Sequence, residues 1–103
     1  MADLAPEVMQ EHATQAVELL KSMANESRLM ILCLLAGGEL TVSEINKSVP
    51  ISQSALSQHL AALRKGDLVA TRKVAQTIYS RLNGDATVRI IDVLQSIYCP
   101  APV

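Results

Sequence analysis

The sequence predicts a mainly α-helical domain of about five helices that also carries a small two-stranded β-hairpin. Apolar residues recur at spacings of three and four along most of residues 7–65, which is typical of packed helices. From Leu68 onward, apolar and polar residues alternate instead, which is typical of strands. A chain of 103 residues suits one core, so we expect a single domain over residues 1–103.

The first half of the chain contains two segments with helical periodicity. Residues 7–23 form an amphipathic pattern after Pro6, and proline is favoured at the start of a helix. Asn25 can cap a second helix, which Gly37 and Gly38 end. This second segment is apolar on nearly all sides, so we expect it at the centre of the core.

Residues 41–65 contain the signals of two short helices joined by a tight turn. Thr41 and Glu44 form a capping-box pattern that starts a helix through about Ser48, before Pro50. Ser52 can cap the next helix, which extends to about Lys65 and ends at Gly66. Helix, tight turn and helix in this order are typical of a DNA-binding helix-turn-helix.

The alternating segment after Gly66 predicts two strands, with residues 73–76 as their connection. A hairpin that follows a helix-turn-helix is a wing, so the fold expected is a winged helix-turn-helix. Residues 83–85 then lead into a last helix with apolar residues on more than one face. Such a helix needs partners on two sides, and the second partner is expected to be another subunit of a homodimer.

Charge is distributed unevenly along the chain, whose formal net charge is only −1. Residues 1–51 contain three basic and seven acidic side chains, whereas residues 52–83 contain five basic side chains and one acidic. Positive charge is therefore concentrated in the predicted second helix of the helix-turn-helix and the hairpin. A local basic region of this kind favours binding to the phosphates of double-stranded DNA.

The second helix of the helix-turn-helix has one buried and one polar face. Leu56, Leu60 and Leu63 recur at helical spacing and form the buried stripe. Short hydroxyl and amide side chains on the other face suit base edges and phosphates, and basic side chains suit the backbone. The DNA-binding residues predicted on this helix and the hairpin are Ser52, Gln53, Ser54, Ser57, Gln58, His59, Arg64, Lys65, Arg72, Lys73 and Gln76.

Two segments, SQSALSQHLAALRK and LVATRKVAQTIYSRL, resemble the recognition helix and wing of the ArsR/SmtB winged-helix repressors. The segment MANESRLMILCLL resembles the second helix of that family, so the resemblance covers nearly the whole chain. It implies a homodimer built through the first and last helices, bound to an inverted-repeat operator and released by an inducer. One departure is that Gly66-Asp67 stands where the family usually has the reverse order.

The sequence gives no support for a metal as inducer. The family's usual Glu-Leu-Cys-x-Cys site corresponds here to residues 39–43, where Thr41 and Ser43 replace the two cysteines. Hydroxyl groups are poor ligands for soft metals. The last helix also lacks the acidic and histidine ligands of zinc-sensing members, so we expect no metal and no other cofactor.

Cys33 and Cys99 are the two cysteines of the chain. Each taken alone is more often an inert small apolar side chain. Their contexts, ILCLL and SIYCP, resemble the dithiol branch of the family that senses persulfides and redox change. This resemblance implies a disulfide or polysulfide bridge between the second and last helices of one subunit, with reactive sulfur species or an oxidant as inducer.

Two alternatives remain open at this point. The cysteines can be inert in a repressor that responds to a metal or to an unknown inducer. An enzyme with a cysteine nucleophile is a weaker hypothesis, because His12 and His59 have other interpretations and no acyl-transfer or phosphate-binding motif is present. We therefore predict a regulator and not an enzyme.

The chain contains no sign of a membrane segment or a secretory signal. Its longest apolar run, residues 29–36, is about half of the roughly 18 residues that a membrane span requires. A secretory signal begins with a basic region that an apolar stretch follows, whereas the charged side chains among the first ten residues are acidic. We expect a cytoplasmic protein without membrane contacts.

Overall fold

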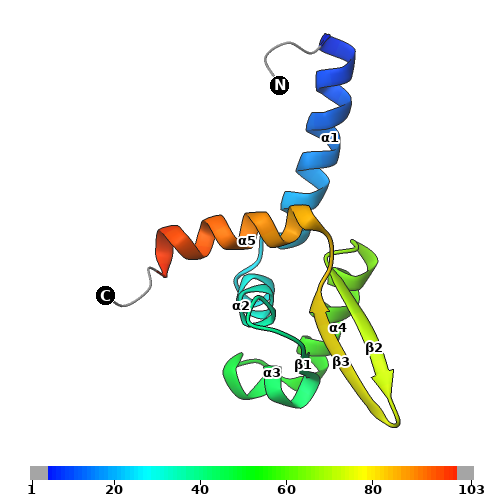
Figure 1. The fold of residues 1–103 in the computed structure, drawn as a ribbon, viewed down its shortest axis with the longest axis vertical. Helices are drawn as coiled ribbons and strands as arrows, with labels where there is room; N and C mark the ends of the chain where they lie inside the picture. Colours follow the sequence, from blue (N-terminus) through cyan, green and yellow to red (C-terminus); the bar gives the residue numbers. More distant parts are fainter. Residues whose placement is uncertain (1–4, 100–103) are drawn as a thin grey trace.

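The computed structural model describes residues 5–99 and consists of five helices and a small sheet (Figure 1). The mainly helical fold with a hairpin wing is confirmed. The elements in chain order are α1 (Pro6–Met23), α2 (Glu26–Leu35), β1 (Leu40–Thr41), α3 (Val42–Ser48), α4 (Gln53–Lys65), β2 (Val69–Val74), β3 (Thr77–Leu82) and α5 (Asp85–Tyr98).

Three helices begin at the predicted capping residues. The Asn25 side chain accepts a hydrogen bond from the backbone N–H of Arg28 at 3.1 Å. Both bonds of the predicted capping box are present between Thr41 and Glu44, at 3.0 and 3.2 Å. The Ser52 hydroxyl accepts from the third residue of α4 at 3.1 Å. Each cap satisfies a backbone donor that the first helical turn leaves unpaired.

The sheet has three strands instead of the two predicted, because β1 pairs with the hairpin. The strand order is β1-β3-β2, and all pairs are antiparallel. Lys73 pairs with Ile78, and Val74 pairs with Thr77, so both residues before the turn belong to β2. The predicted connection over residues 73–76 was therefore too long. Ala75 adopts a φ of 54°, and this left-handed conformation reverses the chain within two residues.

The core lies between α2, α4 and the sheet, with α5 across one side. Ile31 and Leu32 of α2 are fully buried, which confirms the predicted central position of this helix. Leu56 and Leu63 of α4 are fully buried, and Ile91 of α5 completes the cluster. Burial of these aliphatic side chains is the main favourable contribution to folding.

The turn between α4 and β2 explains the unusual order Gly66-Asp67. Asp67 has the positive φ of 63°, and aspartate is among the residues that tolerate this conformation. A Cβ on Gly66 would lie 3.1 Å from the Ser22 hydroxyl and 3.1 Å from a methyl of Leu68. Glycine at position 66 therefore suits the close approach of Ser22 in α1, whereas its φ of −83° is open to any residue.

The helices α1 and α5 carry apolar side chains that stay exposed among the described residues. Figure 1 shows α1 extending away from the body and α5 with one free end. On α1, Val17 and Leu20 are 46% and 53% exposed, and on α5 Val93, Ile97 and Tyr98 are 56–77% exposed. None of the helices in the part of the chain described is long and apolar enough to cross a membrane.

Candidate nucleic-acid interface

The helix α4 separates its apolar and polar residues onto opposite faces. Its leucine stripe packs against the core. The side chains predicted to contact bases all lie on the exposed side of its first two turns: Gln53, Ser54, Ser57 and Gln58. The helix α4 therefore presents these four hydrogen-bonding side chains to solvent as a polar row. The row lies beside the N-terminus of α4, which has a partial positive charge.

Ser52 stands apart from this polar row because its hydroxyl is already engaged as the N-cap. It accepts from the Ala55 backbone and lies 3.3 Å from the Ser54 hydroxyl. A serine hydroxyl offers one donor and two acceptor sites, and the bond from Ala55 uses one of the acceptor sites. Ser52 thus orients the start of α4 as well as lying beside the exposed face.

The turn between α3 and α4 is fixed by Asn46, a residue that the sequence analysis did not single out. Its side-chain amide donates to the backbone carbonyl of Ile51 at 2.9 Å and to that of Val49 at 3.5 Å. Asn46 is therefore a positioning residue for α4. The available signal was a polar amide one helical turn before Pro50, in the middle of the helix-turn-helix.

His59 of α4 is half-buried and contacts Arg28 of α2. The Arg28 Nε–H donates to the His59 Nδ1 at 3.2 Å, and an Nη1–H of Arg28 donates to the carbonyl of Ser22 at 3.3 Å. Arginine cannot accept a hydrogen bond, so Nδ1 must be the acceptor and the ring proton lies on Nε2. The hydrogen bond from Arg28 occupies Nδ1, so Nε2 is the ring nitrogen of His59 that could contact DNA.

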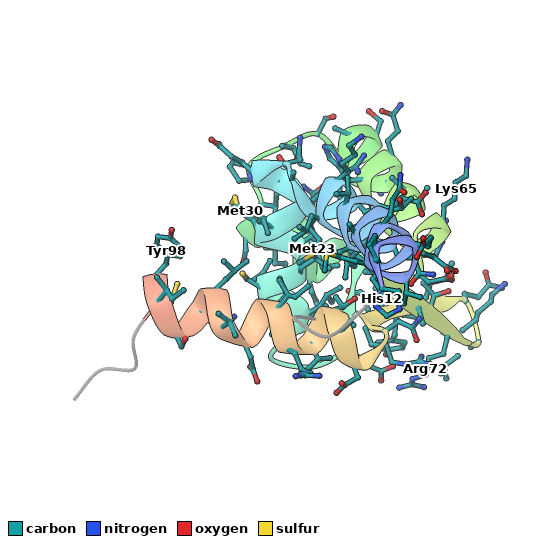
Figure 2. The ribbon with its side chains drawn as sticks, turned by 90° about the horizontal axis from the view of Figure 1, so that it is seen from above. His12, Met23, Met30, Lys65, Arg72 and Tyr98 are labelled. Atoms are coloured by element: carbon teal, nitrogen blue, oxygen red, sulfur yellow. The ribbon has the colours of Figure 1, made fainter. Side chains whose placement is uncertain are left out.

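The basic residues of the predicted interface fall into separate groups. Arg64 and Lys65 are exposed in the last turn of α4. Arg72 and Lys73 are neighbours in β2, so their side chains point to opposite faces of the hairpin. Gln76 is exposed in the two-residue turn. Figure 2 shows Lys65 and Arg72 on one side of the molecule and Tyr98 on the other.

Arg72 is engaged with two residues of the sheet region. Its Nε–H donates to both carboxylate oxygens of Glu39 at 2.8 and 2.9 Å. Its guanidinium lies 4.8 Å from the centre of the Tyr79 ring. The hydrogen bond from Arg72 holds the pKa of Glu39 below its usual value, and the charge of Arg81 acts in the same direction.

Cys33 lies in α2 and Cys99 directly follows α5, and these two helices contact each other. The Gln95 side-chain amide of α5 donates to the backbone carbonyl of Cys33 in α2 at 3.3 Å. Cys99 follows one turn later, and its backbone N–H donates to the carbonyl of Gln95 at 2.8 Å. Cys33 is half-buried, whereas Cys99 is exposed. Burial raises the pKa of the Cys33 thiol, and the nearby Cys99 sulfur raises it further.

A shallow cavity of about 240 Å³ adjoins Cys33 and is lined mainly by apolar atoms of Met30, Cys33 and Leu34, with Ser48. This cavity lies on the face of α2 that contains the Cys33 thiol. Within residues 5–99, no three histidine, cysteine or acidic side chains gather in a group that could hold a metal ion.

Comparisons with known proteins decide the family. Residues 25–71, which contain α2, the helix-turn-helix and the start of β2, match the model of the bacterial regulatory proteins of the arsR family. The transcriptional activator HlyU of Vibrio cholerae is 50% identical over 93 residues, which cover 90% of this chain and 86% of HlyU. The chain belongs to the arsR family. It is a DNA-binding transcriptional regulator with a winged helix-turn-helix fold.

Further relatives agree with this assignment. The biofilm growth-associated repressor of Agrobacterium fabrum is 42% identical over 91 residues, covering 88% of this chain and 78% of that protein. The structure of reduced HlyU from Vibrio cholerae superposes with a TM-score of 0.87, at 48% identity, over 90% of this chain and 98% of that one. A homodimeric winged helix-turn-helix domain of Mycobacterium bovis superposes with a TM-score of 0.76, at 31% identity, over 94% and 89% of the two chains. These arsR-family relatives are regulators, not enzymes.

Proposed function

We propose that this arsR-family protein is a homodimeric repressor that inserts α4 into the major groove at each half of an inverted-repeat operator. The observation that supports this most strongly is the polar row on α4, which lies opposite the buried leucine stripe. Amides such as Gln53 and Gln58 can pair bidentately with adenine, and the hydroxyls of Ser54 and Ser57 can reach base edges or phosphates.

The basic residues would supply contacts to the phosphate backbone. Arg64 and Lys65 lie at the other end of α4 from the polar row, where the helix would cross the edge of the groove. Lys73 and Gln76 are exposed near the tip of the hairpin, where they would meet the adjacent backbone or minor groove. Such contacts are independent of sequence and make affinity depend on salt.

The uncovered apolar faces of α1 and α5 support the homodimer. Val93 and Ile97 lie one turn apart on α5 and are both more than half exposed. A shallow apolar cavity of about 450 Å³ lies along the same helix, beside Val93 and Leu94. Apolar area of this kind on a small domain marks an interaction site. The homodimeric relative from Mycobacterium bovis has the same fold.

We further propose that Cys33 and Cys99 of one subunit become joined and that the joined form binds the operator less tightly. The hydrogen bond from Gln95 to the Cys33 carbonyl places the two helices in contact one turn before Cys99. Because α5 would also form the dimer interface, a covalent link to α2 would alter the relative position of the two α4 helices. Free cysteines that become joined in a reducing compartment usually serve regulation.

The chemistry of this step requires an inducer that accepts electrons. A polysulfide can transfer a sulfur atom to each thiol to give two persulfides, which then condense to a trisulfide with loss of hydrogen sulfide. A peroxide would instead convert one thiol to a sulfenic acid, which the second thiol attacks with loss of water. A direct disulfide needs α-carbons within about 7 Å, whereas extra sulfur atoms bridge a longer gap.

The second candidate is an arsR-family repressor with inert cysteines and a metal or unknown inducer. Its support is the raised pKa of Cys33, because a smaller thiolate fraction makes this thiol less nucleophilic. Mass spectrometry after exposure to inorganic polysulfide separates the two. A species that gains one sulfur and loses two hydrogens supports the bridge, whereas unmodified protein supports inert cysteines.

The DNA-binding part of the proposal is tested by selection from a pool of random duplexes. The proposed dimer should enrich an inverted repeat whose half-sites are spaced by about one helical turn. Enrichment of a single half-site without symmetry would contradict the dimeric arrangement. The enriched duplex then serves as the operator in the measurements described in the Discussion.

A further inference from the structure

The outer face of the sheet contains an ion pair that the operator-binding model leaves unexplained. Strand pairing places Arg72 of β2 opposite Tyr79 of β3, and Tyr79 opposite Thr41 of β1. Glu39 precedes β1, and its hydrogen bonds with Arg72 place its carboxylate on the same face. The Arg72 side chain therefore extends across β3, over the Tyr79 ring, to the Glu39 carboxylate.

The contact engages only part of the Arg72 guanidinium. Both short hydrogen bonds to Glu39 come from Nε, and within the described part of the chain the Nη groups of Arg72 donate no hydrogen bond to another residue. The Arg72 side chain is 50% exposed, and that of Glu39 is 30% exposed. Exposed ion pairs contribute little to folding stability, so this one can be exchanged at small cost.

A carboxylate and a phosphate offer arginine the same kind of acceptor, a pair of anionic oxygens. Arg72 lies in the hairpin next to Lys73, close to the turn that the DNA-binding model places on the backbone. Arg81, two residues from Tyr79 on the same face, adds a second positive charge beside Glu39. Among the described residues, Glu39 is the acidic side chain that pairs with Arg72.

We propose that Glu39 binds Arg72 in the free protein as an internal substitute for a DNA phosphate, and that Arg72 exchanges this carboxylate for the phosphate backbone when the hairpin contacts a duplex. The Tyr79 ring supports the guanidinium in both states, so the exchange requires rotation of one side chain and no change of fold. Glu39 thereby lowers the affinity of the regulator for all DNA, and binding is weaker than the positive charge of the hairpin alone would give. This inference rests on the proposed operator binding.

The test uses full-length protein and a fluorescein-labelled duplex of arbitrary sequence, with affinity measured by anisotropy over a series of salt concentrations. The variants are Glu39→Gln, Arg72→Gln and the double variant. Asp85→Asn is the matched control, because it removes the acid of another exposed arginine pair, Asp85–Arg89 at 3.5 Å.

The exchange predicts three results. Glu39→Gln binds about 2- to 5-fold more tightly, as expected when an exposed ion pair no longer has to be broken. Arg72→Gln lowers the slope of affinity against salt by about one, because one phosphate contact is lost. In the Arg72→Gln background, Glu39→Gln has no further effect, and Asp85→Asn changes affinity little in either background.

Two results would overturn the exchange while leaving operator binding intact. One is an unchanged salt slope in Arg72→Gln, which would mean that Arg72 stays on Glu39 in the complex. The other is an equal gain from Glu39→Gln with and without Arg72, which would indicate a general charge effect. Failure of the wild-type protein to bind any duplex would instead overturn the proposed function together with the exchange.

Discussion

The Nε–H of Arg28 lies 3.2 Å from the Nδ1 of His59 and joins the start of α2 to the middle of α4. A second donor of Arg28 binds the carbonyl of Ser22 at the end of α1. Arg28 therefore connects three helices at one point. This contact joins α4, the proposed DNA-binding helix, to α1, which the proposed dimer would use.

Replacement of Arg28 by alanine should destabilise the protein by ~1 to 3 kcal/mol, because it removes charge-assisted hydrogen bonds and leaves part-buried acceptors unpaired. Chemical denaturation measures the change. Imidazole nitrogen shifts in the wild type should show the proton of neutral His59 on Nε2. A proton on Nδ1 would contradict the observed contact.

Gln58 and Lys73 should contribute to DNA binding in different ways. Gln58→Ala should cost ~1 to 3 kcal/mol on the selected operator and relax specificity at one position of each half-site. Lys73→Ala should weaken binding to operator and random duplex alike and lower the salt slope by about one. Equal effects of both changes on both duplexes would contradict the division into base and phosphate contacts.

The turn at Gly66 and Asp67 gives a stability test that depends on which residue has the positive φ. Gly66→Ala should destabilise by about 1 to 2 kcal/mol, because the new Cβ meets Ser22 and Leu68. Asp67→Gly should change the free energy of unfolding by less than about 1 kcal/mol, because two effects oppose each other. Glycine adopts a positive φ without steric strain, but it also gives the unfolded chain more conformational entropy. A larger loss for Asp67→Gly than for Gly66→Ala would contradict this account.

The proposed dimer interface is tested at Val93, which is 56% exposed on α5. Val93→Glu would bury an unpaired charge in the interface, so sedimentation at micromolar concentration should shift from twice the chain mass to the chain mass. Val74→Glu is the matched control, because this valine is 49% exposed on the hairpin. Dissociation by both variants, or by neither, would argue against an interface on α5.

The sequence predicted local features of the fold well and long-range contacts poorly. The caps at Asn25, Thr41 and Ser52 were predictable because a cap and its partner lie within three residues. The strand β1 has two residues, too few to show a period of two. It was therefore missed, and the wing was expected to have two strands.

The candidate site shows the same contrast between local features, which the sequence predicted, and long-range contacts, which it did not. The polar face of α4 follows from helical periodicity, so its exposure could be predicted from the sequence. The engagement of Arg72 by Glu39 and of His59 by Arg28 could not, because the partners lie 33 and 31 positions apart. Only the packing of the sheet and of α2 against α4 brings them together, and no local pattern encodes such contacts.

The cysteine pair should respond to pH in a defined direction. Because the pKa of Cys33 is raised above its usual value, its thiolate fraction at neutral pH is smaller than that of an ordinary cysteine. In a Cys99→Ser variant, alkylation of Cys33 by iodoacetamide should be slow at neutral pH and should keep accelerating above the usual thiol pKa. A rate that levels off near neutrality would contradict the raised pKa.

Operator affinity before and after exposure to inorganic polysulfide tests the central claim most directly. Fluorescence anisotropy on the selected operator should show a loss of roughly 5- to 150-fold for the wild type, the range of a typical coupling free energy. Cys33→Ser and Cys99→Ser should bind as tightly as the reduced wild type and should not respond. An unchanged wild-type affinity after verified sulfur insertion, or a Cys99→Ser variant that polysulfide still releases, would contradict the proposed dithiol switch.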